Sequence, residues 1–254
     1  TLKVALWPRA VVTLKNVELL DPEAAPETRR PIVLLHEADV ALNWKKLIDG
    51  QVVPERVNVK GMDVTLPVDA GNPEKVFSVT GVNAELNLER PGMVDIVNAD
   101  AVVQGIRVTA QGAFSMGQDD SGDFTLTAQD MAAVREQLNQ ALNYMDRVKW
   151  PESSPPRLIV NLSDDPKGGV RVGMDLQAPS LRYGKIILKD FLFSGDYADS
   201  VIMAKRFTMR DAETAGFVSL SLQADLKKHT LIWDVRSTAP LVSWAVAIVD
   251  EALV

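Results

Sequence analysis

The sequence contains no cysteine, and only two of its 254 residues are histidine. The absence of cysteine excludes disulfides, thiolate metal sites and cysteine nucleophiles. His36 and His229 fall within strand-like segments beside charged residues, so we interpret them as surface side chains, not as a general base or metal ligand. Serine-hydrolase, P-loop and dinucleotide-binding motifs are also missing. The sequence therefore favours a protein that is not an enzyme and carries no cofactor.

Basic residues are too few to favour a nucleic-acid partner. The chain has 27 Lys and Arg against 34 Asp and Glu, a net charge of -7, whereas nucleic-acid binding depends on clustered Lys and Arg. No apolar run reaches the roughly 18 residues of a membrane-spanning helix, and no signal peptide opens the chain. Because the chain starts in a strand pattern and stops in a helix pattern, we expect a piece of a longer protein whose membrane anchor lies outside it.

Apolar and polar residues alternate strictly along much of the sequence. The clearest examples are residues 82–89, 170–177 and 218–226. A period of two is typical of strands with one buried and one solvated face, and it favours antiparallel pairing over buried parallel strands. Residues 90–92 and 164–168 carry the Gly, Pro and Asp of turns between such strands.

A short pattern shifts the apolar parity of its strand at five places. Each copy starts with an apolar residue and a polar residue, followed by Gly, Asn or Asp. It ends with an apolar residue, a residue of any type, and a second apolar residue. The copies are residues 14–19, 59–64, 79–84, 103–108 and 188–193. A β-bulge absorbs such a shift by adding one residue, and Gly, Asn and Asp tolerate the left-handed backbone that some bulges need. We predict bulges or sharp bends at Gly61, Gly81 and Gly105.

Two segments have helical spacing. Residues 130–148 place Val134, Leu138, Leu142 and Met145 on one stripe, which we expect to pack on the apolar side of the sheet. A second helix is expected from Thr238 to the end of the chain. The Asp-rich turn at Asp119, Asp120 and Asp123 lacks the ligand spacing of a calcium loop, so no metal site is predicted there.

The predicted fold is mainly β. It is a long, strongly curved antiparallel sheet, shaped as a groove, half-barrel or taco, with two amphipathic helices. The predicted units are a curved β-sheet over residues 1–128, an amphipathic helix over 129–150, and a second β unit over 151–254 that continues the sheet and ends in a helix. The Pro-rich segment 151–156 marks the boundary.

The apolar strand faces admit two interpretations. They are either the inner faces of a close-packed sandwich or barrel, or the lining of an open groove in which acyl chains replace a second sheet. For the groove, the candidate lining residues follow the predicted bulges on the inward parity. They are Val64, Leu66, Val82, Leu86 and Val108.

The order of segments resembles that of a known family. A strand at residues 11–19 leads through a Pro-rich excursion at 21–26 to an apolar strand at 32–42, a short helical turn at 44–50 and a strand at 57–66. This order is similar to the start of the periplasmic part of AsmA-like proteins, which are related to TamB and the repeating β-groove lipid-transfer proteins. The amphipathic helix, Pro155-Pro156 and the strands that follow resemble the family's later pattern.

The resemblance implies a periplasmic protein of a diderm bacterium, anchored in the inner membrane. Its curved sheet would hold phospholipid or another acyl-chain lipid and support lipid traffic to, or assembly of, the outer membrane. Envelope proteins are expected as further partners, and no catalytic residue is carried over. The alternative is a protein-binding scaffold or adaptor of an envelope complex that accepts a strand or helix from a partner.

Overall fold

A computed structural model describes residues 2–5, 10–21, 30–69, 72, 74–115, 128–184, 186–212 and 216–238. The described residues are mainly β, as predicted, with 69% strand; they contain an open sheet of 14 strands and two helices. Every strand pair whose register is defined is antiparallel. The chain divides into two compact units: residues 1–104 with 108–140, and residues 105–107 with 141–254.

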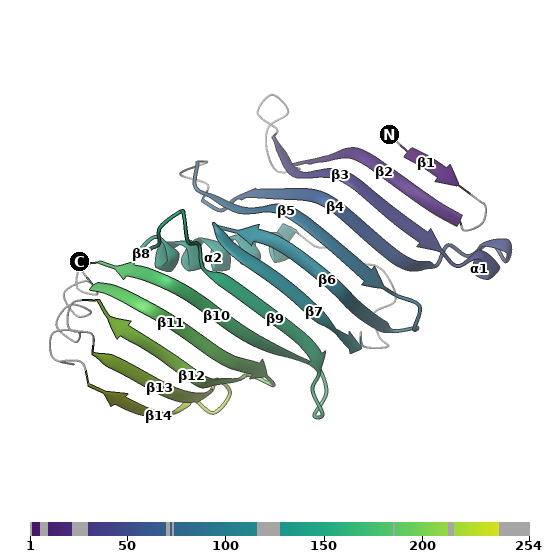
Figure 1. Cartoon of the computed structure of the whole chain (residues 1–254). Helices are drawn as coiled ribbons and strands as arrows, with labels where there is room; N and C mark the ends of the chain where they lie inside the picture. The colour runs from purple at the N-terminus through teal and green to yellow at the C-terminus, as the bar shows by residue number, and fades with distance from the viewer. Residues whose placement is uncertain are drawn as a thin grey trace. The chain divides into compact units, whose positions relative to one another are not determined.

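In the first unit, each strand pairs with its neighbours in the chain (Figure 1). The strands are β1 (Leu2–Ala5), β2 (Ala10–Leu20), β3 (Pro31–Leu42), β4 (Pro54–Pro67), β5 (Val76–Asn87), β6 (Met93–Val103) and β7 (Ile106–Ser115). A short helix, α1 (Trp44–Ile48), connects β3 to β4. The side chain of Asn43 caps this helix by accepting a 2.9 Å hydrogen bond from the Lys46 N–H.

The second unit repeats this meander. It contains β8 (Val148–Lys149), β9 (Arg157–Asp164), β10 (Val170–Tyr183), β11 (Ile186–Ala198), β12 (Val201–Asp211), β13 (Phe217–Asp225) and β14 (Thr230–Ser237). From β9 to β14 each strand pairs with the next, and β8 pairs with the end of β10. The β9–β10 turn is closed by an Asp165 N–H bond to the Gly169 carbonyl at 2.9 Å, where turn residues predicted it.

Helix α2 (Ala128–Met145) lies where helical spacing predicted a helix. Within the first unit the Arg135 guanidinium lies 3.4 Å from the Asp21 carboxylate, which ties the helix to the end of β2. Of the expected stripe, Leu142 is buried, Leu138 and Met145 are half-buried, and Val134 is exposed. The packing of the stripe on the sheet stays a prediction. The expected C-terminal helix and the Asp119 turn lie outside the described residues.

The predicted bulges at Gly61 and Gly81 are confirmed, and they compensate each other. Between the pairs Lys60↔Asn83 and Met62↔Val82, β4 carries one extra residue, Gly61. Before the next pair, Val64↔Val79, β5 carries the extra residue, and the original register returns. Both glycines have left-handed backbones, with φ of 69° and 63°. Each shift in parity is therefore absorbed locally, as the apolar pattern required.

Side chains from the partner strand bind the backbone of each bulge. The Gly61 N–H donates to Asn83 Oδ1 at 3.1 Å, and the Gly81 N–H donates to Asp63 Oδ1 at 2.7 Å. Asp63 and Asn83 each lie two residues after the glycine of their own strand. The two bulges thus satisfy one another's free N–H groups, which a ladder alone would leave unpaired.

The prediction for Gly105 is wrong. Gln104 and Gly105 form the two-residue turn that reverses the chain between β6 and β7, and their φ values are 49° and 81°. Two consecutive positive φ values are the requirement of a type I′ hairpin turn, which also favours Gly at the second position. The parity shift here reflects two strands joined by a turn, because a two-residue connection produces the same apolar spacing as a bulge.

Candidate functional site

The predicted lining residues of β4 and β5 lie on one face of the first unit. Leu66 pairs with Phe77, Val64 with Val79, Val82 with Met62 and Leu86 with Val57. Directly paired residues of antiparallel strands point to the same face, and residues two apart in one strand do so as well. Since the two bulges restore the register, this face is continuous along both strands.

The face on which Val108 lies follows from the β6–β7 hairpin. A two-residue turn at positions 104 and 105 sets Val103 opposite Ile106, and therefore Val108 opposite Ala101. Ala101 lies between Ala99 and Val103 on the same parity, and these two residues pair with Ala84 and Val79. All five predicted residues consequently share one face.

Register extends this face across the neighbouring strands. Val33, Leu35, Ala38 and Val40 of β3 pair with residues on this face of β4, and the β2 and β6 partners follow in the same way. We call this set the first apolar face. It consists of Val12, Leu14, Val17, Leu19, Val33, Leu35, Ala38, Val40, Val57, Val59, Met62, Val64, Leu66, Phe77, Val79, Val82, Ala84, Leu86, Ile96, Ala99, Ala101 and Val103.

Most of the first apolar face is accessible to solvent. Only Ala38 and Leu66 are buried, whereas Val17 and Leu19 are exposed and the remaining members are half-buried. In the described part of the chain, no large side chain is less than 2% exposed. A close-packed two-layer core buries such residues almost completely. No second layer of described residues therefore covers this face.

The second unit has an equivalent surface, which we call the second apolar face. Register aligns three rows across β9, β10, β11, β12, β13 and β14. The rows are Leu158, Leu176, Phe193, Phe207, Leu220 and Val235; Val160, Met174, Gly195, Ala204, Leu222 and Trp233; and Leu162, Val172, Tyr197, Ile202, Ala224 and Leu231. Ala204 and Gly195 are buried, while Trp233 at the β14 edge is 63% exposed.

The opposite face of the first unit is mainly polar and carries ion pairs. The Glu37 carboxylate accepts hydrogen bonds from the ammonium groups of Lys15 and Lys60, the latter at 2.7 Å, and Lys60 also reaches Asp39 at 3.3 Å. These two ammonium donors lower the pKa of Glu37 from 4.5 to about 2. The polar face is thus adapted to water, whereas the first apolar face is not.

Acid should weaken the fold through Glu37. A carboxyl whose pKa is lowered on folding stabilises the folded state above its unfolded pKa of 4.5, and this contribution is lost as pH falls toward about 2. We expect Glu37→Gln to lower the urea midpoint at pH 7 and to have a smaller effect at pH 3. Glu85→Gln is the control, because Glu85 is 45% exposed and lies 4.0 Å from Arg56. An equal loss at both pH values would contradict this assignment.

Sequence reasoning missed the role of His36. The flanking pairs Leu35↔Met62 and Glu37↔Lys60 place it beside Gly61, and Lys15↔Glu37 and Val17↔Leu35 place it beside Asn16. Strands β2, β3 and β4 therefore each carry one extra residue at the same level of the sheet, namely Asn16, His36 and Gly61. The register between these strands consequently does not shift there. The change of apolar parity from Leu35 to Ala38 was a visible signal, but His36 lacks the Gly, Asn or Asp of the pattern.

The described residues contain no cluster of three or more His, Cys, Asp or Glu that could hold a metal ion. Neither described helix combines the length and apolar character needed to cross a bilayer. No family model matches the chain, and no curated protein or solved structure is significantly similar to it.

Proposed function

We propose that this chain is a lipid-binding or lipid-transfer module whose apolar sheet faces hold acyl chains. The observation that carries the proposal is the first apolar face, which is continuous over β2 to β6 and only half-buried. Soluble monomers rarely expose contiguous apolar patches beyond a few hundred Å² unless the patch binds something. Acyl chains match this surface because it offers apolar contact and almost no hydrogen-bonding groups.

The dimensions of the face suit chain-like ligands. Strands of 11 to 14 residues extend roughly 35–45 Å at about 3.3 Å per residue, and neighbouring strands lie about 4.8 Å apart. Each buried methylene contributes roughly 0.8 kcal/mol, so partial burial of one chain is enough to retain it. The positive-φ residues Asn16, Gly61 and Gly81 favour local bending, and we propose that the face is concave, as a groove.

The cellular setting proposed here rests on the resemblance to AsmA-like proteins. It places the module in the periplasm, anchored to the inner membrane through a segment outside this chain, where it would support outer-membrane lipid homeostasis or assembly. The proposed residues in contact with lipid are Val64, Leu66, Val82, Leu86 and Val108.

Lipid extraction tests the proposal directly. Purified chain should yield acyl-chain lipid on extraction into organic solvent and mass spectrometry, and the delipidated chain should take up a fluorescent fatty acid in a saturable manner. A folded chain that carries no lipid and takes up none would overturn the proposal.

A second candidate function is a scaffold that binds a polypeptide. Among the described strands, β14 forms an edge of the second unit, where Leu231, Ile232 and Trp233 are all exposed, and edge strands accept added strands. Co-purification of a stoichiometric envelope protein with lipid-free chain would favour this candidate instead.

A further inference from the structure

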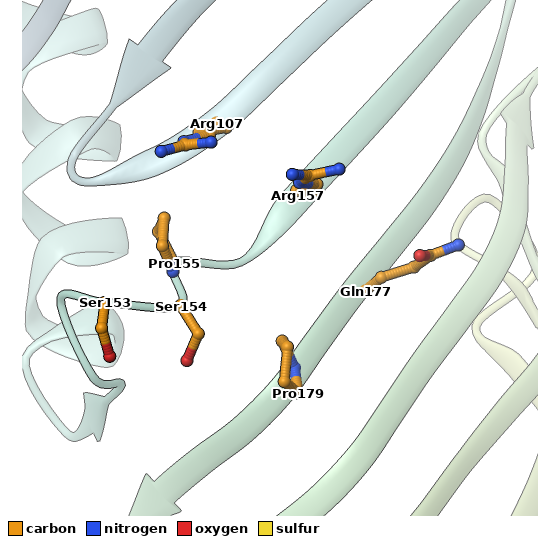
Figure 2. Close-up of a pocket in the computed structure, with 7 residues that line it drawn as sticks. All are labelled: Arg107, Ser153, Ser154, Pro155, Arg157, Gln177 and Pro179. Carbon is orange, nitrogen blue, oxygen red and sulfur yellow. The ribbon is translucent and has the colours of Figure 1, made fainter.

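A hollow of about 310 Å³ lies within the second unit and is lined by charged and polar side chains. Its lining comprises Arg107, Arg157, Ser153, Ser154 and Gln177, together with two prolines (Figure 2). Arg157 pairs with Gln177, and both lie one residue from the Leu158↔Leu176 pair of the second apolar face. The hollow is therefore on the polar side of this sheet, away from the surface proposed for acyl chains.

A backbone contact brings the two arginine residues near one another. The Arg107 N–H donates to the Pro156 carbonyl at 3.0 Å, and Arg157 is the next residue of the chain. The Ser154 N–H donates to the Pro151 carbonyl at 3.0 Å, so a turn presents Ser153 and Ser154 at the rim. Pro156 is buried and has a fixed φ, which limits the movement of this segment.

Neither arginine of the hollow forms an ion pair with a described residue. Arg56, Arg135, Arg171, Arg210 and Arg236 each lie within 4.0 Å of a carboxylate oxygen. Arg107 and Arg157 have no such ion pair in the described part of the chain. The carboxylates nearest to the lining residues in sequence belong to Glu152 and Asp175, and neither of them lines the hollow.

We propose that this hollow is a binding site for a phosphate group. The guanidinium fork of arginine matches phosphate oxygens with paired hydrogen bonds, and two such groups supply the charge that a phosphate monoester or diester requires. The hydroxyls of Ser153 and Ser154 and the amide of Gln177 provide further donors of the right type. The phosphate belongs either to a soluble molecule or to a lipid headgroup at a bilayer surface. The site does not depend on acyl-chain binding, because it uses other residues on the other face.

Titration with inorganic phosphate tests the site. We expect saturable binding by calorimetry, weakened about tenfold or more by Arg107→Gln and by Arg157→Gln, because each removes a charge-assisted contact. Arg206→Gln is the matched control, since Arg206 is an exposed arginine of β12 outside the hollow. Circular dichroism checks that the variants fold, and if Arg107→Gln does not, Arg157→Gln carries the test.

Vesicle sedimentation distinguishes the two sources of phosphate. Binding to vesicles that contain phosphatidylglycerol but not to pure phosphatidylcholine, with the same dependence on Arg157, identifies an anionic headgroup. Binding of free phosphate alone identifies a soluble ligand. Failure to bind either probe, or an equal loss in Arg206→Gln, overturns the site without affecting the proposal for the apolar faces.

Discussion

Replacing Leu86 by aspartate should abolish or strongly reduce lipid uptake while the chain still folds. Leu86 pairs with Val57 and Ile96 in the row at one end of the first apolar face, and it is half-buried. In the lipid-free chain the new carboxylate can reach water, so the cost to folding is modest. An acyl chain lying over position 86 would have to bury that charge, which costs several kcal/mol when no partner is present. Fluorescent fatty-acid titration measures the loss.

Asn87→Asp is the matched control for Leu86→Asp. It adds the same charge one residue further along β5, on the polar face, opposite Arg56 and Asp95. It also retains the side-chain oxygen that accepts a hydrogen bond from the Glu89 N–H. We expect Asn87→Asp to take up lipid as the wild type does. If Leu86→Asp unfolds the chain and the wild type carries no lipid, the face is a close-packed core and the groove is refuted.

Gly61→Val should destabilise the fold by about 1–3 kcal/mol, the cost of holding an unsuitable residue in a left-handed backbone. Gly61 has φ of 69°, and an added Cβ would lie 2.9 Å from His36 Cδ2. The loss is a large part of the 5–15 kcal/mol that stabilises a typical domain. Urea denaturation monitored by circular dichroism measures it.

Two comparisons separate backbone strain from crowding. Gly81 has φ of 63°, and nothing lies within 4 Å of an added Cβ, so Gly81→Val should show the strain alone. Asparagine already occupies the equivalent place in β2, where Asn16 has φ of 51°. We therefore expect Gly81→Asn to cost less than Gly81→Val. If both valine variants are as stable as the wild type, the left-handed backbone at the two bulges does not require glycine, and this prediction is wrong.

The features that could be predicted from the sequence are those that short segments determine. Alternation specified strands and their polar and apolar faces, and glycine at a parity shift located the bulges at Gly61 and Gly81. The same reasoning put Val64, Leu66, Val82, Leu86 and Val108 on a common parity. Register places the first four on one face, and the two-residue turn at 104 and 105 places Val108 with them. Gly105 was misassigned because a type I′ turn and a bulge share the local pattern.

Other features depend on contacts between distant segments. The hollow brings Arg107 together with Arg157, which is 50 residues further along the chain, and only strand order and the turn before β9 make them neighbours. The mutual hydrogen bonds of Asp63 and Asn83 require the observed β4–β5 register. Local propensity contains no information on either arrangement.

The compensating bulges also determine how this sheet tolerates the loss of a residue. Deleting Gly61 alone would keep Met62, Val64 and Leu66 on the apolar face, because Gly61 is the extra residue of β4. It would instead leave the extra residue of β5 without its counterpart and shift the register of β4 against β5 by one residue beyond the bulge. Because the two extra residues restore a common register only as a pair, we expect them to be gained or lost together in evolution. Alignments of related chains should therefore place a gap at both positions or at neither.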